Sequence, residues 1–350
     1  MMKRRTFLQS TAAIALATPF VGKARAAQAT VTLASYGGVV QQKYQSAVIE
    51  PFQKANPDIK IEYYQMNNSA QNLGTLRGQK SAPQVDLSIL DVTVAKGGTD
   101  EGIFKPVTAS EVPNIADLYP QAIFDGVAGV GVMFDSLPLV YAPDRAPKKP
   151  ASWMDLAGPE FKRQFVIGGV PSLDALALLF ILSGQKPEIT DYAGAVEAGM
   201  TAWEKIAPNV LTWDPRPDAA ALVIGKGASV GASWNARAQA HIDAAPGKLV
   251  AAVPAEGTAL QINVINLVNG APNEKAALQF MNYALGAEAQ KAFTEAMYYA
   301  PTNKNAKISP EALSRTVASQ MDKVVSVDWI KVAGMRDGII KQWQSKVLKQ

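Results

Sequence analysis

The sequence contains no cysteine and only one histidine, His241, among its 350 residues. Disulfide bridges and thiolate metal sites are therefore excluded, and so is a metal centre built on several histidines. After residue 26 no stretch reaches 18 consecutive apolar residues, so the sequence predicts no membrane-spanning helix there. With 48% hydrophobic and 18% charged residues, the chain is too apolar for disorder, and its length suits two lobes of roughly 100–200 residues each.

Residues 1–26 have the features of an export signal. Their charged residues are Lys3, Arg4, Arg5, Lys23 and Arg25, so this segment carries +5 and the net charge of +4 leaves 4 − 5 = −1 for the remainder. An apolar stretch over residues 10–21 leads to a small-x-small cleavage pattern at 24–26, and residues 4–8 resemble a twin-arginine signal. We therefore expect cleavage near Ala26 and a periplasmic location. The remainder shows no positive excess for nucleic acid.

Strands and helices alternate along the rest of the chain. The patterning predicts strands at 31–34, 59–63, 85–90, 165–167, 228–234 and 260–268. It predicts helices at 39–55, 69–80, 173–183, 192–207, 221–226, 273–285, 287–296, 310–322 and 328–346. The β-α-β-α-β order at the start favours an α/β fold with a mostly parallel sheet. Ligands of such sheets bind beyond the carboxyl ends of the strands, which directs attention to residues 35–38 and 91–93.

Known catalytic motifs lack their partners in this sequence. Residues 227–231 match the nucleophile-elbow pattern G-x-S-x-G, but His241 is the only base available and residues 230–240 contain no acid. A phosphate-binding loop is absent. Tyr298 and Tyr299 leave ferric-ion binding open as an alternative, without a histidine or carboxylate cluster beside them. We expect no enzymatic activity, no cofactor and no metal.

Polar and aromatic side chains instead gather where predicted strands and helices end. The candidate ligand-binding residues are Ser35, Tyr36, Gly37, Asp91, Thr93, Trp234, Asn235, Arg237, Gln261, Asn263 and Tyr299. Aromatic faces hold a cation or a short alkyl chain, an arginine forks onto a carboxylate, and an aspartate pairs with an ammonium group. Together they predict a site for a small charged solute between two lobes.

Several ordered stretches carry a family resemblance. The strongest are Pro254-Ala255-Glu256-Gly257 through Asn263, the pattern at 271–285, and Tyr299-x-Pro301-x-Asn303, supported by 150–156, 208–210 and 231–235. The chain resembles a periplasmic solute-binding protein of an ABC importer, from the group that includes the spermidine/putrescine-binding proteins. The resemblance implies a two-lobe type II fold with a crossed hinge. It also implies a monomer without catalysis, whose partners are a small solute and an ABC permease in the inner membrane.

The same resemblance suggests which residues bind and how the chain divides. The family's ligand positions fall on Tyr36, Asp91, Thr93, Trp234 and Tyr299, and Asp174 is the best match for an acidic position of the second lobe. The expected N-terminal lobe comprises residues 27–138 plus 264–305. The C-terminal lobe takes 139–263 plus 306–350.

Two departures from the polyamine-binding pattern bear on the ligand. Polyamine binders carry Trp-x-Asp after the Glu-Gly turn, where this chain has Gln261-Ile262-Asn263, and Arg237 adds a cation. A diamine would then leave one buried ammonium unpaired, at roughly 3–5 kcal/mol. We therefore favour a short zwitterionic amino acid such as 4-aminobutyrate, held by Asp91 and Arg237. Polyamine binding and a ligand-sensing role at a receptor remain alternatives.

Overall fold

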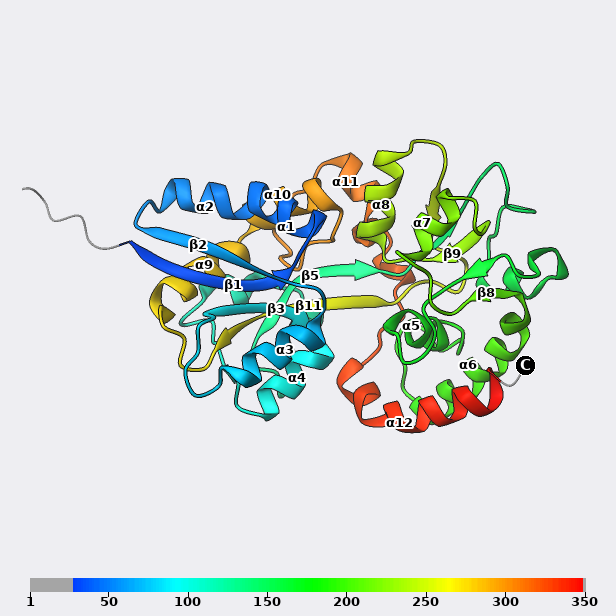
Figure 1. Cartoon of the computed structure of the whole chain (residues 1–350), viewed down its shortest axis with the longest axis horizontal. Coiled ribbons are helices and arrows are strands. Elements are labelled where there is room, and N and C mark those ends of the chain that lie inside the picture. Colours follow the sequence, from blue (N-terminus) through cyan, green and yellow to red (C-terminus); the bar gives the residue numbers. More distant parts are fainter. Residues whose placement is uncertain (1–27, 349–350) are drawn as a thin grey trace, which may run out of the picture.

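The computed structural model describes residues 28–348, which fold into two α/β lobes lying side by side (Figure 1). The predicted export signal and its cleavage near Ala26 lie outside the described residues. In the first lobe the strands are β1 (Ala29–Tyr36), β2 (Ile59–Met66), β3 (Leu87–Asp91), β4 (Phe104–Lys105), β5 (Val130–Ser136) and β11 (Leu260–Val268). In the second they are β6 (Leu139–Tyr141), β7 (Phe165–Val166), β8 (Val210–Thr212), β9 (Val230–Ala232) and β10 (Val250–Ala252).

The first sheet has the order β2-β1-β3-β11-β4, with β5 also paired to β11. β1 runs parallel to β2 and β3, and β11 enters antiparallel to β3, which places Asn263 opposite Asp91. The carboxyl ends of β1 and β3 therefore lie at one edge together with the first half of β11. This confirms the predicted β-α-β-α-β start and positions Tyr36, Asp91 and Asn263 as neighbours. The sheet is mixed and not mostly parallel as predicted, because β11 pairs antiparallel with β3, β4 and β5.

Helices cover both faces of the first sheet, with α3 and α4 on one face and α1, α2 and α10 on the other (Figure 1). The first-lobe helices are α1 (Val39–Tyr44), α2 (Glu50–Ala55), α3 (Ser69–Gly78), α4 (Val92–Asp100), α9 (Glu274–Ala284) and α10 (Ala287–Met297). The others are α5 (Leu173–Ile181), α6 (Tyr192–Ile206), α7 (Ala219–Ile224), α8 (Asn235–Ala244), α11 (Pro310–Arg315) and α12 (Trp329–Lys346). Within residues 28–348, none of these helices combines the length and hydropathy that crossing a bilayer requires.

Local sequence explains where several elements begin. Ile59 and Ile61 of β2 are buried while Lys60 and Glu62 are exposed, the alternation of an edge strand with one side open to solvent. Ser172 caps α5, as predicted, by accepting a hydrogen bond from the Asp174 backbone N–H at 3.3 Å.

The predicted helix at 39–55 is one helical run, but it contains a π-helical turn at Gln45–Ile49 between α1 and α2. Pro51 follows this turn and has no backbone N–H to donate to the carbonyl four residues earlier. Because that α-helical hydrogen bond is missing, the helix can widen to a π-turn there.

Several elements differ from the sequence predictions, and the short strands β4, β6, β8 and β10 were not predicted. The predicted helix at 310–322 stops at Arg315, because Thr316 adopts extended backbone angles, and two short 3-10 turns follow. The predicted strand at 228–234 is confined to β9, since Ser233 and Trp234 lead into α8. β5 was not predicted, because its Val130–Ser136 segment is buried throughout and shows no alternation.

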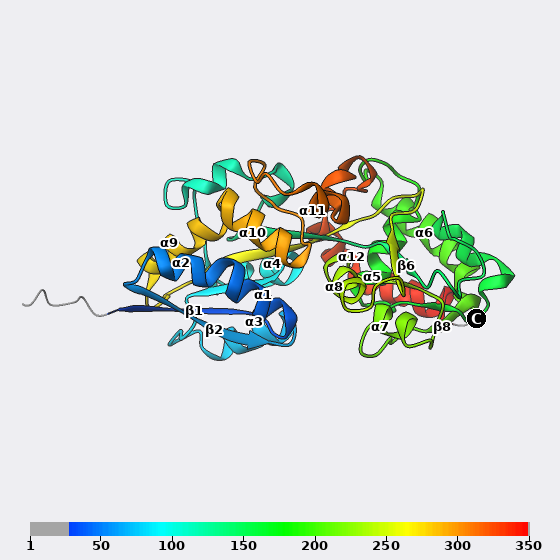
Figure 2. The ribbon, with the colours of Figure 1, turned by 90° about the horizontal axis from the view of Figure 1, so that it is seen from above.

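The two lobes are joined by crossing segments between β5 and β6 and just before β11, while α11 lies at the junction seen from above (Figure 2). β11 pairs with the first sheet from Leu260 onward, four residues before the expected lobe boundary at residue 264. Gly257 has a φ of +102°, and a Cβ there would stand 2.2 Å from the Lys323 carbonyl oxygen, so only glycine fits this approach.

Thr258, just before β11, is hydrogen-bonded to Leu137, which lies between β5 and β6, so it connects the two crossing segments. Its Oγ1 accepts a hydrogen bond from the Leu137 N–H at 2.9 Å and donates one to the Leu137 carbonyl at 3.1 Å, and the side chain is fully buried. Thr258→Val keeps the shape but leaves this N–H unpaired, so we expect the free energy of unfolding to fall by about 1–3 kcal/mol in urea titration. Thr302→Val is the matched control, because this buried hydroxyl makes only a 3.5 Å contact with Gln290. Equal losses in both variants would contradict a stabilising contribution of the Thr258–Leu137 hydrogen bonds.

Candidate functional site

A cavity of about 940 Å³ opens between the lobes. Ten of the twelve predicted ligand-binding residues line it: Tyr36, Gly37, Asp91, Thr93, Asp174, Trp234, Arg237, Gln261, Asn263 and Tyr299. The first lobe contributes the ends of β1 and β3 and the start of β11, and the second contributes the starts of α5 and α8. The fold thus brings most of the predicted residues to one cavity.

On the first-lobe wall, Tyr36 stands at the centre of a hydrogen-bond network. Its hydroxyl donates to Asn263 Oδ1 at 2.8 Å and lies 2.7 Å from Ser69 Oγ. Ser69 Oγ in turn accepts a bond from the Asp91 backbone N–H at 3.0 Å. Burial, with Asp91 nearby, raises the pKa of Tyr36, so this phenol stays neutral and presents its ring and a fixed hydroxyl to the cavity.

Asp91 ends β3 and caps α4. Its Oδ1 accepts hydrogen bonds from the Thr93 N–H at 2.9 Å and from the Thr93 hydroxyl at 2.6 Å. Burial raises the pKa of Asp91, and these bonds, one from Gln261 and the positive charge of Arg336 counteract the rise. The carboxylate is thereby held in one orientation, as recognition of an ammonium group requires.

The second-lobe wall combines an acid, an indole and a guanidinium. Asp174 lies in the first turn of α5, where the Trp234 indole donates a hydrogen bond to it. Burial raises the pKa of Asp174 to about 6, although this bond and the charge of Arg237 act in the opposite direction. Arg237 lies in the first turn of α8 and makes no hydrogen bond or ion pair with any described residue. Its five N–H donors are therefore available to a ligand.

Tyr299, in the segment that follows α10, also lines the cavity. Its ring stacks on Phe293 at a centroid distance of 5.6 Å, and burial raises the pKa of its hydroxyl. The neighbouring Tyr298 points elsewhere, because its hydroxyl accepts a hydrogen bond from Arg315 at 2.6 Å. The two phenols, which suggested a ferric-ion site, therefore do not converge. Within residues 28–348, no group of three or more His, Asp or Glu side chains is placed to hold a metal ion.

Two predicted binding residues do not line the cavity. Ser35 is buried within β1, because this strand extends two residues further than predicted. Asn235 is buried and donates hydrogen bonds to the carbonyls of Tyr298, at 3.2 Å, and Arg315, at 2.9 Å. Its amide therefore joins α8 to the chain around α11 and has a structural role in this arrangement.

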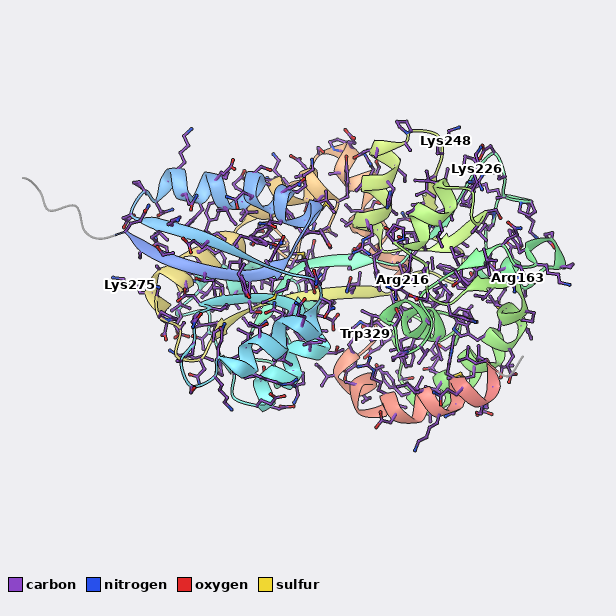
Figure 3. All side chains as sticks on the ribbon, viewed as in Figure 1. Arg163, Arg216, Lys226, Lys248, Lys275 and Trp329 are labelled. Atoms are coloured by element: carbon purple, nitrogen blue, oxygen red, sulfur yellow. The ribbon has the colours of Figure 1, made fainter. Side chains whose placement is uncertain are left out.

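Sequence reasoning missed several cavity residues, among them Ser69, Asp135, Trp329 and Arg336. Trp329 and Arg336 come from α12, and Figure 3 shows Trp329 where the lobes face each other. Arg336 donates a hydrogen bond to the Pro171 carbonyl at 3.2 Å. Asp135 had a usable signal, since it is one acid in the apolar run from Val130 to Leu137, but the α12 residues had none.

Comparison with known proteins places this geometry in a protein family. The chain is 23% identical over 265 residues to the spermidine/putrescine-binding periplasmic protein of Escherichia coli (strain K12), covering 71% of this chain and 72% of that protein. It is 22% identical over 303 residues to the gamma-aminobutyric acid-binding protein of Pseudomonas aeruginosa, covering 81% and 80%. A solved ABC transporter substrate-binding protein from Bradyrhizobium japonicum shares the fold, with a TM-score of 0.77 at 22% identity and coverage of 91% and 99%. The family of bacterial extracellular solute-binding proteins matches residues 47–318, and the chain belongs to this family.

Proposed function

We propose that this solute-binding protein captures a small zwitterion, such as 4-aminobutyrate, between its lobes and delivers it to an ABC permease. The observation that carries this proposal is the mixed charge of the cavity. Three carboxylates, Asp91, Asp135 and Asp174, share its lining with the guanidiniums of Arg237 and Arg336. A ligand with an ammonium group and a carboxylate can pair with both kinds of group, whereas a diamine can pair with only one.

The start of β11 supports the same choice. Gln261 and Asn263, which stand where polyamine binders carry a tryptophan and an aspartate, both line the cavity. Asn263 Oδ1 already accepts the Tyr36 hydroxyl, so this position offers an amide in place of a second carboxylate. Among the relatives, one is named for polyamines and another for gamma-aminobutyric acid, so both ligand classes belong in the test.

Polyamine binding is the second candidate, because the carboxylates of the cavity outnumber its guanidiniums by three to two. A polyamine would have to place an ammonium group near Arg237 or Arg336. That contact is repulsive, and it is strongest once closure has excluded water.

The proposed mechanism is ligand-stabilised closure. A zwitterion that contacts Asp91 of the first lobe and Arg237 of the second binds the closed form better than the open one, and so shifts the population toward closure. In this proposal the permease recognises the closed form of the protein. A receptor that binds the same closed form would give the protein a ligand-sensing role.

We further propose that the protein acts in the periplasm as a monomer, after cleavage near Ala26, and leaves its ligand chemically unchanged. The only histidine supports the last point, because His241 Nε2 lies 3.1 Å from Asp218 and is not among the cavity residues. Ser229 of the G-x-S-x-G pattern is buried beside β9, also away from the cavity lining.

Isothermal titration calorimetry of the mature protein at pH 7.5 tests the ligand class. We expect 4-aminobutyrate to bind near micromolar affinity, about −8 kcal/mol. Butylamine and butyrate each keep one charged end and should bind at least about 30-fold more weakly, because a cavity charge is then left unpaired. Putrescine should also bind more weakly. Tight putrescine binding without any 4-aminobutyrate binding would overturn the zwitterion proposal and favour the second candidate.

A further inference from the structure

Asp135 is a buried acid at the junction of the lobes. It lies near the end of β5, where the chain leaves the first sheet for β6 of the second, and its side chain also lines the ligand cavity. Only 3% of the residue is exposed. A buried carboxylate is costly unless it is paired, so its position between hinge and cavity requires an explanation.

The bonds to Asp135 cross from one lobe to the other. Its Oδ1 accepts hydrogen bonds from the Ser136 N–H at 2.8 Å and the Ala236 N–H at 3.1 Å, and the Asn235 N–H also donates to the carboxylate. Asn235 and Ala236 open α8, whose own N-cap residue, Trp234, supplies no side-chain bond. An acid of the first lobe therefore caps a helix of the second, at the end where a negative charge is favoured.

We propose that Asp135 is a positioning residue whose ionised carboxylate fixes the first turn of α8, and with it Trp234 and Arg237, for ligand binding. This inference rests on the proposed function, because Arg237 is assigned there to the ligand. The titratable groups that face Asp135 are Arg237 from α8 and Tyr299 from the segment after α10. Arg237 favours the ionised form, and the phenol of Tyr299 is neutral.

The protonation of Asp135 then links ligand affinity to pH. Burial raises the pKa of Asp135 to about 7, against the hydrogen bonds and the charge of Arg237. Because this value lies above the ordinary value of about 4, the folded protein binds the extra proton and loses stability as the pH rises from about 4 to about 7. The ionised carboxylate is thus maintained at a cost to folding, as is common at functional sites.

The experiment compares the wild-type protein with Asp135→Asn at pH 5.5 and pH 8. 4-Aminobutyrate should bind wild-type protein about tenfold more tightly at pH 8, because Asp135 is then ionised. At pH 5.5 Asp135→Asn should bind 4-aminobutyrate with the affinity of wild type. At pH 8 it should bind this ligand about tenfold more weakly than wild type does. The melting temperature of the empty variant should exceed that of wild type by a larger margin at pH 8 than at pH 5.5, because the raised pKa lowers the stability of wild type progressively between pH about 4 and about 7.

Asp174→Asn distinguishes the effect of Asp174 from that of Asp135. This variant should bind 4-aminobutyrate more weakly than wild type, but its affinity should still change with pH near 7. A wild-type pH profile in Asp135→Asn, or a lower melting temperature at pH 8, would mean that Asp135 is only a structural cap, and would overturn the inference.

Measurements on the ligand-free protein test the positioning role of Asp135 independently of the zwitterion proposal. If wild-type protein bound no 4-aminobutyrate at any pH, the zwitterion proposal would fail, whereas the melting curves would still report on Asp135. Hydrogen exchange at the Asn235 and Ala236 amides, which donate to the Asp135 carboxylate, adds a direct measure of the first turn of α8 once it is corrected for its intrinsic pH dependence. Protection should fall from pH 8 to 5.5 in wild type and stay constant in Asp135→Asn. A constant value in both proteins overturns the positioning role.

Discussion

Arg237→Ala should weaken the binding of 4-aminobutyrate by about 2–4 kcal/mol, or about 30- to 700-fold. The guanidinium is exposed in the cavity and makes no hydrogen bond or ion pair with a described residue, so its donors are free for the ligand carboxylate. Its loss also removes the positive charge that favours ionised Asp135 and Asp174. Isothermal titration calorimetry at pH 7.5 measures the effect.

The same substitution should change the stability of the empty protein by no more than about 1 kcal/mol, because the exposed side chain makes no hydrogen bond or ion pair with a described residue and acts on Asp135 and Asp174 only through its charge. Arg237→Lys should give an intermediate affinity, because lysine keeps the charge but loses the planar fork. Lys248→Ala is the control, since Lys248 is an exposed cation on the outside of the second lobe, away from the cavity (Figure 3). Arg237→Ala with wild-type affinity would remove Arg237 from the binding site.

The sequence predicted the part of the site that follows from sheet geometry. Tyr36 and Asp91 end parallel strands, and residues at the carboxyl ends of neighbouring parallel strands necessarily meet at one edge. Asn263 was predicted from its place on the strand at 260–268, and the antiparallel register of β11 sets it opposite Asp91. For these residues, pattern and topology together were sufficient.

The rest of the site depends on tertiary packing that no local pattern contains. Arg336 lies on α12, far along the chain from Asp91, yet its charge acts on that carboxylate across the cavity. Asn235 follows Trp234 directly and was predicted to bind ligand, but the start of α8 turns its amide toward the carbonyls of Tyr298 and Arg315. Adjacent residues at a helix start point in different directions, which sequence proximity does not reveal.

α12 is held at both of its ends by tryptophan. Trp329 Nε1 donates a hydrogen bond to the Leu260 carbonyl of β11 at 2.7 Å, which connects the start of the helix to the first sheet. Trp343, near the other end, packs edge-on against Trp203 and Trp213 of the second lobe, at centroid distances of 5.0 and 5.2 Å. Between these anchors lies Arg336, so the position of this cavity residue depends on both of them.

Trp343→Ala should lower the free energy of unfolding by about 3–5 kcal/mol, the usual cost of deleting a fully buried aromatic ring. Trp343 is 1% exposed, and the substitution removes the partner of two other indoles. Because α12 also lines the cavity, its loosened end should weaken 4-aminobutyrate binding as well. Urea unfolding followed by tryptophan fluorescence gives the stability, and calorimetry under native conditions gives the affinity.

Trp343→Phe is the matched control, and it distinguishes packing from hydrogen bonding. The buried Trp343 Nε1 has no hydrogen-bond partner among the described residues, so phenylalanine removes an unpaired N–H while keeping a ring in the cluster. We expect this variant to lose less than about 1.5 kcal/mol and to retain ligand affinity. If Trp343→Ala lost stability but bound ligand as wild type does, α12 would be anchored sufficiently by Trp329. The cavity would then not depend on the aromatic cluster of the second lobe.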